Sequence, residues 1–200
     1  MRVLLVGGAG TIGRRLAPAL AGEHDIIVAG RNSGDVRVDI TSADSIRSMF
    51  EQTPDIDAVV GIAASGPLDV FDTLTEEQLL ANMRGKFFGQ ANVVLIGQHY
   101  VNVGGSFTLT SGVFADQAAK GVTSGGVVSG ALHSFVLSAA MELQGRYRVN
   151  AVSPTMVEDS ADEFGHLFPG LRAVPMTVLV DHYVGCVEGT GTGQIIRAYG

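Results

Sequence analysis

Residues 2–13 read RVLLVGGAGTIG, an apolar run that ends in a cluster of glycines. The cluster fits GxGxxG when counted from Gly8 and GxxGxxG when counted from Gly7, with Gly10 and Gly13 shared by both patterns. We expect a buried strand that turns sharply into a helix, where missing side chains let a pyrophosphate approach backbone amides and the helix dipole. A tight turn also needs glycine when nothing binds there, so a purely structural turn is the alternative.

A second apolar run, DIIVAG over Asp25–Gly30, follows at the spacing of one strand–helix–strand unit and favours the dinucleotide site. In NAD sites an acidic residue about 20 positions beyond the glycines accepts hydrogen bonds from ribose hydroxyls. Here Arg31 and Asn32 occupy that position. A carboxylate would repel a 2′-phosphate, whereas a guanidinium fork can bind it. The sequence therefore predicts NADP(H) rather than NAD(H), with a solvated loop arginine as the alternative.

Composition restricts the class of protein and its partners. The 200 residues are 46% hydrophobic and include 27 glycines, which is enough for one sizeable core and predicts a single domain over 1–200. A formal net charge of -7 and the absence of a basic run argue against nucleic acid or a membrane surface as a partner. We expect no apolar run of membrane-spanning length and no signal peptide.

Cysteine and histidine usage bears on compartment and metals. The single cysteine, Cys186, excludes an internal disulfide framework and predicts a cytoplasmic protein. The five histidines share no ligand spacing with Cys186 or with one another, so we expect no metal site.

Strand-like and helix-like segments alternate along the rest of the chain. Further apolar runs predict strands over 36–40, 57–64, 101–110, 148–152 and 194–198. Cap residues and helical spacing predict helices over 42–52, from residue 75 onward, around 131–143 and within 177–187. This alternation predicts an α/β fold whose parallel sheet is covered on both faces. The irregular region 153–175 would lie beyond the carboxyl end of a strand, where ligands bind.

Motifs along essentially the whole chain resemble those of the short-chain dehydrogenase/reductase superfamily. After the glycine cluster they come in the family's order: Val38-Asp39-Ile40-Thr41, Ala63-Ala64-Ser65-Gly66, Asn82-Met83-Arg84-Gly85-Lys86-Phe87, Leu109-Thr110-Ser111, Arg148-Val149-Asn150-Ala151-Val152-Ser153-Pro154 and Thr192-Gly193-Gln194. The second of these is Asn-Asn-Ala-Gly in the family, so both asparagines are missing here. The resemblance implies a Rossmann-type doubly wound sheet in three layers, with about seven strands in the order 3-2-1-4-5-6-7.

The same resemblance implies which residues contact the cofactor. In the family, an aspartate at the position of Asp39 contacts the adenine. The implied NADP(H) contacts are Gly7, Gly8, Gly10, Thr11, Ile12, Gly13, Arg31, Asn32, Asp39, Ile40, Ala63, Ala64, Ser65, Pro154 and Thr155.

The chemistry departs from the family's pattern. In the family a Tyr-x-x-x-Lys pair follows the active-site serine; the tyrosine exchanges a proton with the substrate oxygen, and the lysine lowers its pKa and binds the nicotinamide ribose. Alignment through Gly130–Phe135 puts Gly125 at the tyrosine position and Ser129 at the lysine position. Ser111 and Asn82 keep the other two positions of the catalytic tetrad. Losing an acid/base group typically removes about 10² to 10⁴ in rate.

No other side chain is expected to replace the missing pair. The four tyrosines lie outside the segment that lines this site in the family. His133 follows Ser129 by one helical turn, but it falls beside the apolar stripe and is expected to pack or to meet an interface. Ser111 is the surviving polar group expected to touch a ligand, with a strand-end serine as the alternative.

Two further expectations concern assembly and the substrate lid. Two long helices resemble those that pair across the family's dimer interface; one carries Phe87, Phe88 and Val94, and the other carries Phe135 and Val136. This predicts a homodimer or homotetramer, and burial inside one chain is the alternative. The family's lid follows Pro154, where the aromatic residues Phe164 and Phe168 are expected to help cover an apolar ligand. The acidic residues of the same region are expected to lie on a solvated helix face: Glu158, Asp159, Asp162 and Glu163.

Two functions stay open. One is an NADP(H)-dependent oxidoreductase acting on a small carbonyl or alcohol, with Ser111, Asn82 or a water handling the proton by an atypical or impaired route. The other is a non-catalytic NADP(H)-binding redox sensor or regulatory module, which needs only the glycine turn, Arg31 and the oligomer helices. A structural subunit that no longer binds nucleotide is disfavoured because the glycine turn is complete. Hydride transfer depends mainly on the cofactor, so the missing pair does not exclude a reductase.

Overall fold

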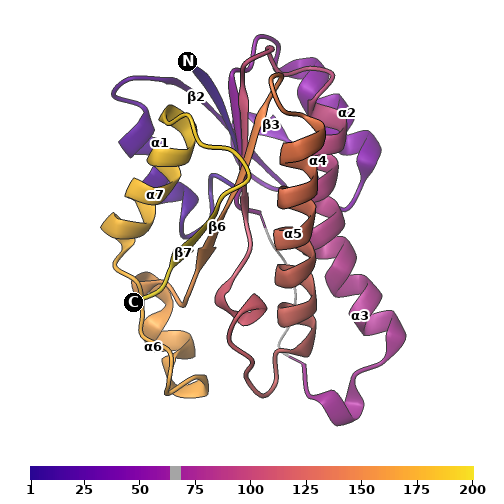
Figure 1. The fold of residues 1–200 in the computed structure, drawn as a ribbon, viewed down its shortest axis with the longest axis vertical. Helices are drawn as coiled ribbons and strands as arrows, with labels where there is room; N and C mark the ends of the chain where they lie inside the picture. Colours follow the sequence, from indigo (N-terminus) through magenta and orange to yellow (C-terminus); the bar gives the residue numbers. More distant parts are fainter. Residues whose placement is uncertain (64–68) are drawn as a thin grey trace.

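The computed structural model of the chain describes residues 1–63 and 69–200. Its strands form one parallel sheet in the order β3-β2-β1-β4-β5-β6-β7, with helices on both faces (Figure 1). The strands are β1 (Arg2–Val6), β2 (Asp25–Gly30), β3 (Val36–Arg37), β4 (Ala58–Gly61), β5 (Ser106–Thr110), β6 (Arg148–Pro154) and β7 (Ile195–Ala198). The predicted doubly wound α/β fold and its strand order are confirmed.

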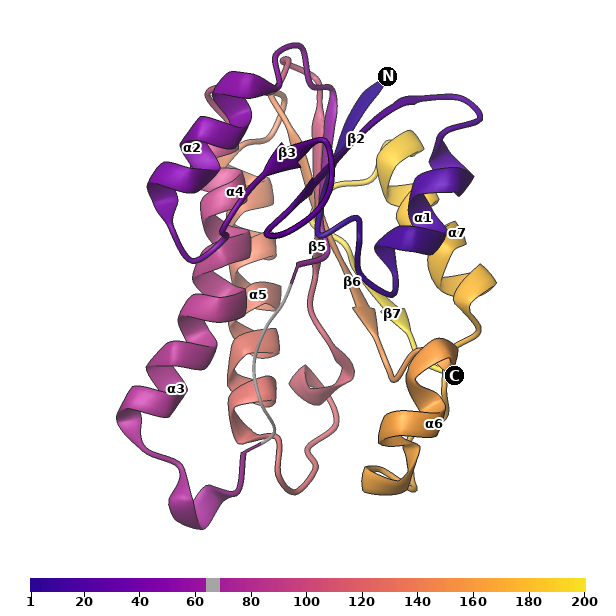
Figure 2. The same cartoon turned by 180° about the vertical axis from the view of Figure 1, so that it is seen from behind.

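Each face of the sheet has its own apolar core because strand side chains alternate between the faces. Leu4 and Val6 of β1 join one core, whereas Val3 and Leu5 join the other. Figures 1 and 2 show the helices that cover these cores on opposite sides. On one side lie α1 (Gly13–Leu20) and α7 (Met176–Glu188); on the other lie α2 (Ala43–Gln52), α4 (Gly89–Gly97) and α5 (Thr123–Glu142). This double burial explains the continuous apolarity of the central strands.

The helix expected from residue 75 onward is not a uniform α-helix. It begins as α3 (Glu76–Asn82), where Thr75 and Gln78 form a capping box. A π-helical segment, η2 (Met83–Phe88), then interrupts it before α4. Single π turns inside α-helices occur often at functional sites, and this one lies directly beside the predicted position of Asn82.

The strand predicted over 101–110 is wrong in its first half. Gly104 adopts a φ of 91°, and the amide of Gly105 donates to the carbonyl of Asn102, so a turn precedes β5. Position 105 has no room for a side chain, because a Cβ there would lie 2.4 Å from the carbonyl oxygen of Asp57. The two glycines therefore start the strand rather than interrupt it.

Other boundaries also differ from the sequence-based expectation. The strand predicted over 36–40 is reduced to β3, and β4 ends at Gly61. Region 153–175 is not uniformly irregular: its first residues complete β6, and short helices follow over Glu158–Ser160, Ala161–Phe164 and Gly165–Leu167. The remaining short helices are Phe71–Thr73 and Val113–Ala115.

The expectation that no apolar segment reaches membrane-spanning length is also wrong. By length and composition alone, the 20-residue helix α5 would suffice, with a mean hydropathy of 1.3 over its most apolar window. In this fold α5 packs on the sheet, with Leu132 and Val136 fully buried in the core. A core helix of this kind passes the same test as a membrane span.

Candidate functional site

The glycine turn after β1 is built so closely that side chains are excluded. Gly7 has a φ of 93°, and a Cβ on it would lie 2.6 Å from the amide nitrogen of Ala63. A Cβ on Gly13 would lie 2.4 Å from the Cα of Gly8, and the amide of Gly10 donates to the carbonyl of Gly7 at 3.0 Å. The start of α1 is thereby held against the end of β1, leaving backbone rather than side chains at the surface of the turn.

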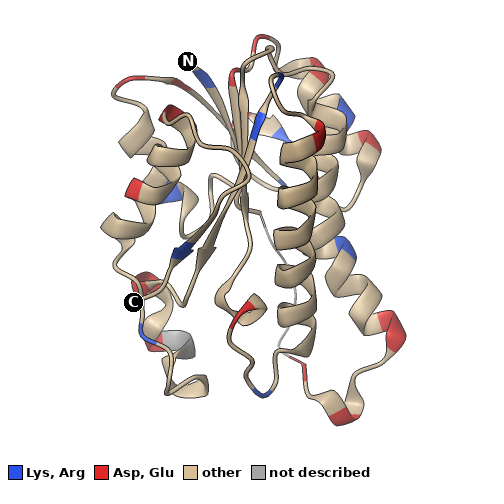
Figure 3. Cartoon of the chain, in the orientation of Figure 1, with Lys and Arg blue, Asp and Glu red and all other residues tan. Residues whose placement is uncertain are grey.

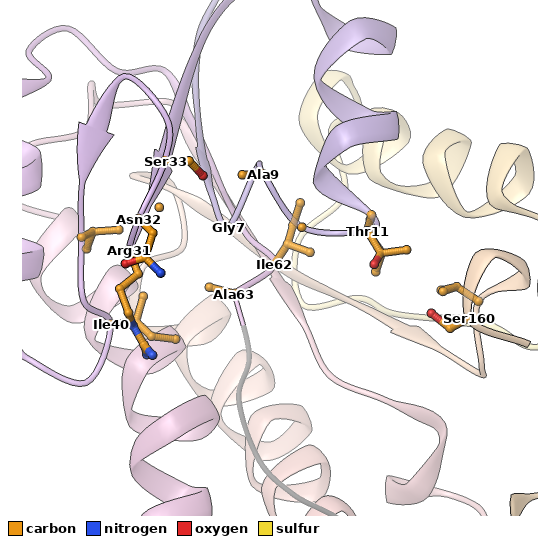
Figure 4. Close-up of a pocket in the computed structure, with 15 residues that line it drawn as sticks. Gly7, Ala9, Thr11, Arg31, Asn32, Ser33, Ile40, Ile62, Ala63 and Ser160 are labelled. Atoms are coloured by element: carbon orange, nitrogen blue, oxygen red, sulfur yellow. The ribbon is translucent and has the colours of Figure 1, made fainter. Parts of the chain in front are cut away.

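A cavity of about 550 Å³ lies beside this turn, at the carboxyl ends of β1, β2 and β4. Figure 4 shows Arg31, Asn32 and Ser33 at one end of this cavity and Thr11 and Ser160 at the other. The chain order reverses between β1 and β4, and such a switch point is where open α/β sheets bind ligands. The cavity therefore has the place and lining expected of a nucleotide site.

Arg31 forms an ion pair with Asp39, another residue predicted to contact the cofactor. Its Nη2 lies 3.6 Å from Oδ1 of Asp39, and both side chains are about half exposed. Asp39 Oδ1 also accepts hydrogen bonds from the amide and hydroxyl of Thr41 at 3.0 and 2.8 Å. These hydrogen bonds, reinforced by Arg31, hold the pKa of the Asp39 carboxyl below its usual value despite partial burial. Arg31 is accessible to an anion, but a 2′-phosphate would share it with Asp39.

A second cavity of about 450 Å³ continues the first toward β5 and β6. The two share four lining residues: Ile12, Ile62, Val157 and Ser160. The second cavity is more apolar in character, with Val113, Phe114 and Leu171 among its walls. Together they form one groove from the Arg31 loop to the end of β5.

Ser111 lines the second cavity and is held there by the strand that precedes it. The side-chain amide of Gln90, itself buried, donates to the carbonyl of Thr110 at 2.8 Å and accepts from its amide at 2.7 Å. The amide of Ser111 donates to the carbonyl of Val152 on β6 at 2.9 Å. The serine therefore sits at a fixed point of the groove, as the predicted active-site position requires.

Lys86 comes from η2 and reaches the same point. Its Nζ donates to the carbonyl oxygen of Ser111 at 2.8 Å, and the residue lines the second cavity together with Asn82. Burial lowers the pKa of the Lys86 ammonium to about 8. A Cβ on Gly112 would lie 3.9 Å from this Nζ and 3.3 Å from the hydroxyl oxygen of Ser129. The cation therefore lies close to the residue that replaces the family's lysine.

His133 also takes part in the site. Its Nε2 lies 2.8 Å from Oγ of Ser111, a contact that the expectation of packing or an interface did not include. Burial holds the pKa of the His133 imidazole below its usual value; Asp116 opposes this shift, and Arg197 and Lys86 reinforce it.

Gly125 and Ser129 are the residues that the alignment puts at the tyrosine and lysine positions. Both line the second cavity, on the first turns of α5. Ser129 is almost fully buried, whereas Gly125 leaves its part of the wall open. A Cβ on Gly125 would have a ring carbon of Phe114 as its nearest neighbour, at 3.5 Å. The cavity therefore has room where the family's tyrosine would project.

The segment after β6 closes over the groove. Phe168 packs against Phe114 with ring centroids 5.2 Å apart, and both line the second cavity. Asp159 is not simply solvated: its Oδ2 accepts from Arg15 Nη2 of α1 at 3.0 Å, which ties the lid segment to the helix after the glycine turn.

The structure gathers most of the predicted residues along the groove. The first cavity is lined by Gly7, Gly10, Thr11, Ile12, Arg31, Asn32, Ile40 and Ala63, and the second by Ser111, Asn82, Pro154 and Thr155. Gly8 and Gly13 instead pack inside the turn, and Asp39 lies beside Arg31. Ala64 and Ser65 lie outside the described residues.

Sequence reasoning missed Lys86 and the contact of His133. Lys86 stands inside the motif that identified Asn82, four positions later, which places the two on the same side of a helix. His133 stands four positions after Ser129, so helical spacing places these two residues on the same side of α5. Within residues 1–63 and 69–200, no group of three or more His, Cys, Asp or Glu side chains could hold a metal ion.

Comparison with known proteins assigns the family. A family model described as Enoyl-(Acyl carrier protein) reductase matches residues 13–175. The crystal structure of the protein lin1944 from Listeria innocua is 37% identical, covers 100% of both chains and has a TM-score of 0.97. A small-chain dehydrogenase is 25% identical, covering 100% of this chain and 96% of that one, with a TM-score of 0.86.

A third structure, a small-chain dehydrogenase in complex with NADPH, is 23% identical with a TM-score of 0.87, covering 98% of this chain and 95% of that one. No curated protein matches at a significant level. The fold and the glycine turn define a dinucleotide-fold protein of the Rossmann type. Within that class, the chain belongs to the short-chain dehydrogenase/reductase family.

Proposed function

We propose that this protein is an NADP(H)-dependent oxidoreductase that reduces a small carbonyl compound or oxidises the corresponding alcohol. The observation that supports this most is the continuous groove, which runs from the glycine turn to Ser111 and joins a polar cavity to a more apolar one. When bound, NADPH would supply the hydride for such a reaction. The chain's own residues would bind and orient both ligands.

The residues of the first cavity fit a dinucleotide. Gly7 and Gly10 line the cavity with backbone alone, and α1 begins directly behind them. Arg31 and Asn32 offer donors at the end of β2, where the ribose next to the adenine would lie. The NADPH complex of a structural neighbour is consistent with the same cofactor here. We propose NADP(H) rather than NAD(H) because the positive charge of Arg31 would attract the 2′-phosphate.

The test is calorimetric titration of the protein with NADPH and with NADH. We expect tighter binding of NADPH, and Arg31→Asp should weaken NADPH by at least about tenfold while leaving NADH little changed, because each lost charge-assisted hydrogen bond costs about 1.5 to 3 kcal/mol. Arg47→Ala, on α2 and outside the cavity lining, is the matched control and should bind as the wild type does. Equal affinities, or an Arg31→Asp variant that still prefers NADPH, would contradict the cofactor assignment.

The absence of a tyrosine at Gly125 favours a second candidate, a non-catalytic NADP(H) sensor. It would bind NADPH as the first candidate does but turn over no carbonyl substrate. Gly125→Tyr combined with Ser129→Lys should create carbonyl reductase activity if only the acid/base pair is missing. A double variant that binds NADPH and stays inactive would mean that the substrate pocket has been lost as well.

Assembly and compartment are proposals of the same kind. We propose a homodimer or homotetramer formed through the outer faces of the α3–α4 segment and α5. A cytoplasmic location is proposed because Cys186 is a buried free thiol.

A further inference from the structure

Ser111 and His133 form a hydrogen-bonded pair that the family's usual tetrad does not contain. The Oγ···Nε2 distance is 2.8 Å, and the two residues come from different elements, the end of β5 and the middle of α5. Ser111 is almost fully buried and lines the second cavity, whereas His133 is half-buried and does not line it. The imidazole thus stands behind the serine, with access to both the groove wall and the outside.

We propose that His133 is the proton donor and acceptor behind Ser111, so that the pair replaces the tyrosine missing at position 125. This inference rests on the proposed oxidoreductase function and assigns a route to its proton.

The step balances in the reducing direction. As the hydride from the nicotinamide reaches the carbonyl carbon, the C–O π bond breaks and the oxygen becomes an alkoxide. That oxygen takes the proton of the Ser111 hydroxyl, and Ser111 takes the proton from Nε2 of His133. Solvent protonates Nδ1 of the half-buried imidazole as Nε2 gives up its proton, so the ring stays neutral overall. Oxidation of an alcohol would run the same transfers backward.

The charged groups around His133 act on its protonation in opposite directions. Asp116 favours the imidazolium, whereas burial, Arg197 and Lys86 favour the neutral ring. Asp116 is itself held in place, accepting from Arg197 Nε at 2.8 Å and from the Tyr199 hydroxyl at 2.5 Å. These interactions fix the position of the carboxylate.

Lys86 binds the backbone of Ser111, whereas His133 binds its side chain. Its ammonium binds the serine's backbone carbonyl, so the hydroxyl is left free to bond His133 and a ligand. A cation beside the groove also favours negative charge on a substrate oxygen. Lys86 is therefore a positioning residue in this proposal, and His133 exchanges the proton.

The kinetic test compares His133→Gln with His99→Gln. Glutamine keeps a hydrogen-bonding group of similar length but cannot titrate, and His99 is exposed at the end of α4, away from both cavities. With NADPH and 4-nitrobenzaldehyde or 9,10-phenanthrenequinone as probes, His133→Gln should lower kcat by about 10²-fold and remove the histidine inflection from its pH profile. NADPH affinity, measured by calorimetry, should stay within about twofold in both variants.

A second measurement does not depend on turnover. The ¹⁵N spectrum of the imidazoles should show that Nε2 of His133 carries a proton in the neutral ring, and Ser111→Ala should move that resonance while the His99 signals stay in place. A proton on Nδ1 instead, or a His133 signal indifferent to Ser111→Ala, would overturn the relay.

The outcomes separate this inference from the proposed function. Normal turnover and an unchanged pH profile in His133→Gln would overturn the relay and leave an NADP(H) oxidoreductase with another proton route. NADPH binding with no turnover of any probe by the wild type would overturn the relay and favour the sensor. Absence of NADPH binding would overturn both proposals.

Discussion

Gly13 decides how closely the first helix approaches the first strand. Its Cα faces the backbone of Gly8 so tightly that any side chain would overlap it, and the backbone cannot move aside without opening the turn. We predict that Gly13→Ala lowers the free energy of unfolding by about 1 to 3 kcal/mol, the usual cost of forcing a group into a packed site. NADPH binding should fall as well, because the amides of the turn would shift. Urea denaturation and calorimetry measure the two effects.

Gly22 provides the matched control for this prediction. It follows the same helix, and a Cβ there would meet nothing within 4 Å. Gly22→Ala should change stability by no more than about 0.5 kcal/mol and leave NADPH binding intact. If Gly13→Ala were as well tolerated as Gly22→Ala, the close approach would have no role in the turn.

At the scale of elements, η2 determines what the central helix presents to the groove. A π turn adds a residue to one turn of the helix and so changes which side chains face the sheet. Here it brings Lys86 to Ser111 beside Asn82, and it leaves Phe87 to pack against Phe135 at a centroid distance of 6.1 Å. One helix therefore serves the groove and the core at once.

The partly buried ammonium of Lys86 has a cost that depends on pH. Its pKa is about 8 in the folded protein and 10.5 when exposed, so below pH 8 the folded state must hold a charge that burial disfavours. Stability should rise as pH increases from about 8 to 10.5, since the unfolded chain then binds more protons than the folded one. At pH 7 we expect Lys86→Met to raise the free energy of unfolding by about 1 to 3 kcal/mol, and this gain should vanish near pH 10.5.

Denaturant unfolding at pH 7, 9 and 10.5 measures this difference. Lys120→Met is the control, because Lys120 is exposed in the loop before α5 and its replacement should not change the pH dependence. A Lys86→Met variant whose stability runs parallel to the wild type at all three pH values would show that the Lys86 ammonium is not buried in solution.

On the scale of the whole molecule, one broad apolar surface remains uncovered. It lies on the outer side of the α3–α4 segment and of α5, and its exposed residues are Leu80, Phe88, Leu95, Val127, Leu137 and Met141. Figure 3 shows that α5 carries almost no charge along its length. The buried members of the predicted helix pairing, Val94 and Val136, face the core instead, so the alternative of burial inside one chain holds for them and not for Phe88. Exposed apolar patches of this kind mark interaction sites.

We predict that Leu137→Glu combined with Met141→Glu lowers the oligomeric state, because two carboxylates would be buried in the proposed interface. Sedimentation velocity of the wild type should give a dimer or tetramer, and of the variant a monomer. Val103→Glu is the control: that valine is 76% exposed in the turn before β5, outside the surface defined above. A monomeric wild type would refute the proposed assembly.

The sequence by itself determined the fold and the first cavity, because both depend on local patterns. Apolar runs of strand length, helical spacing between them and glycines at a turn are each readable within about a dozen residues, and they predicted the parallel sheet and the residues around Gly7 and Arg31. The strand order came from the resemblance to the short-chain dehydrogenase/reductase family. Boundaries failed where backbone geometry outweighed apolarity, as at Gly104 before β5. The absence of a tyrosine at position 125 could also be predicted from the sequence, because the residue type alone shows it.

Only the tertiary structure showed that Lys86 and His133 both contact Ser111. Lys86, Ser111 and His133 are separated by more than twenty residues along the chain from one to the next, and their meeting depends on a π turn, a strand end and a long helix packed on one sheet. The spacing of apolar residues in the sequence does not fix the rotation of a helix about its axis accurately enough to predict such contacts. The 2.8 Å hydrogen bond between Ser111 and His133 forms because β5 and α5 pack together, so only the packed structure could show it.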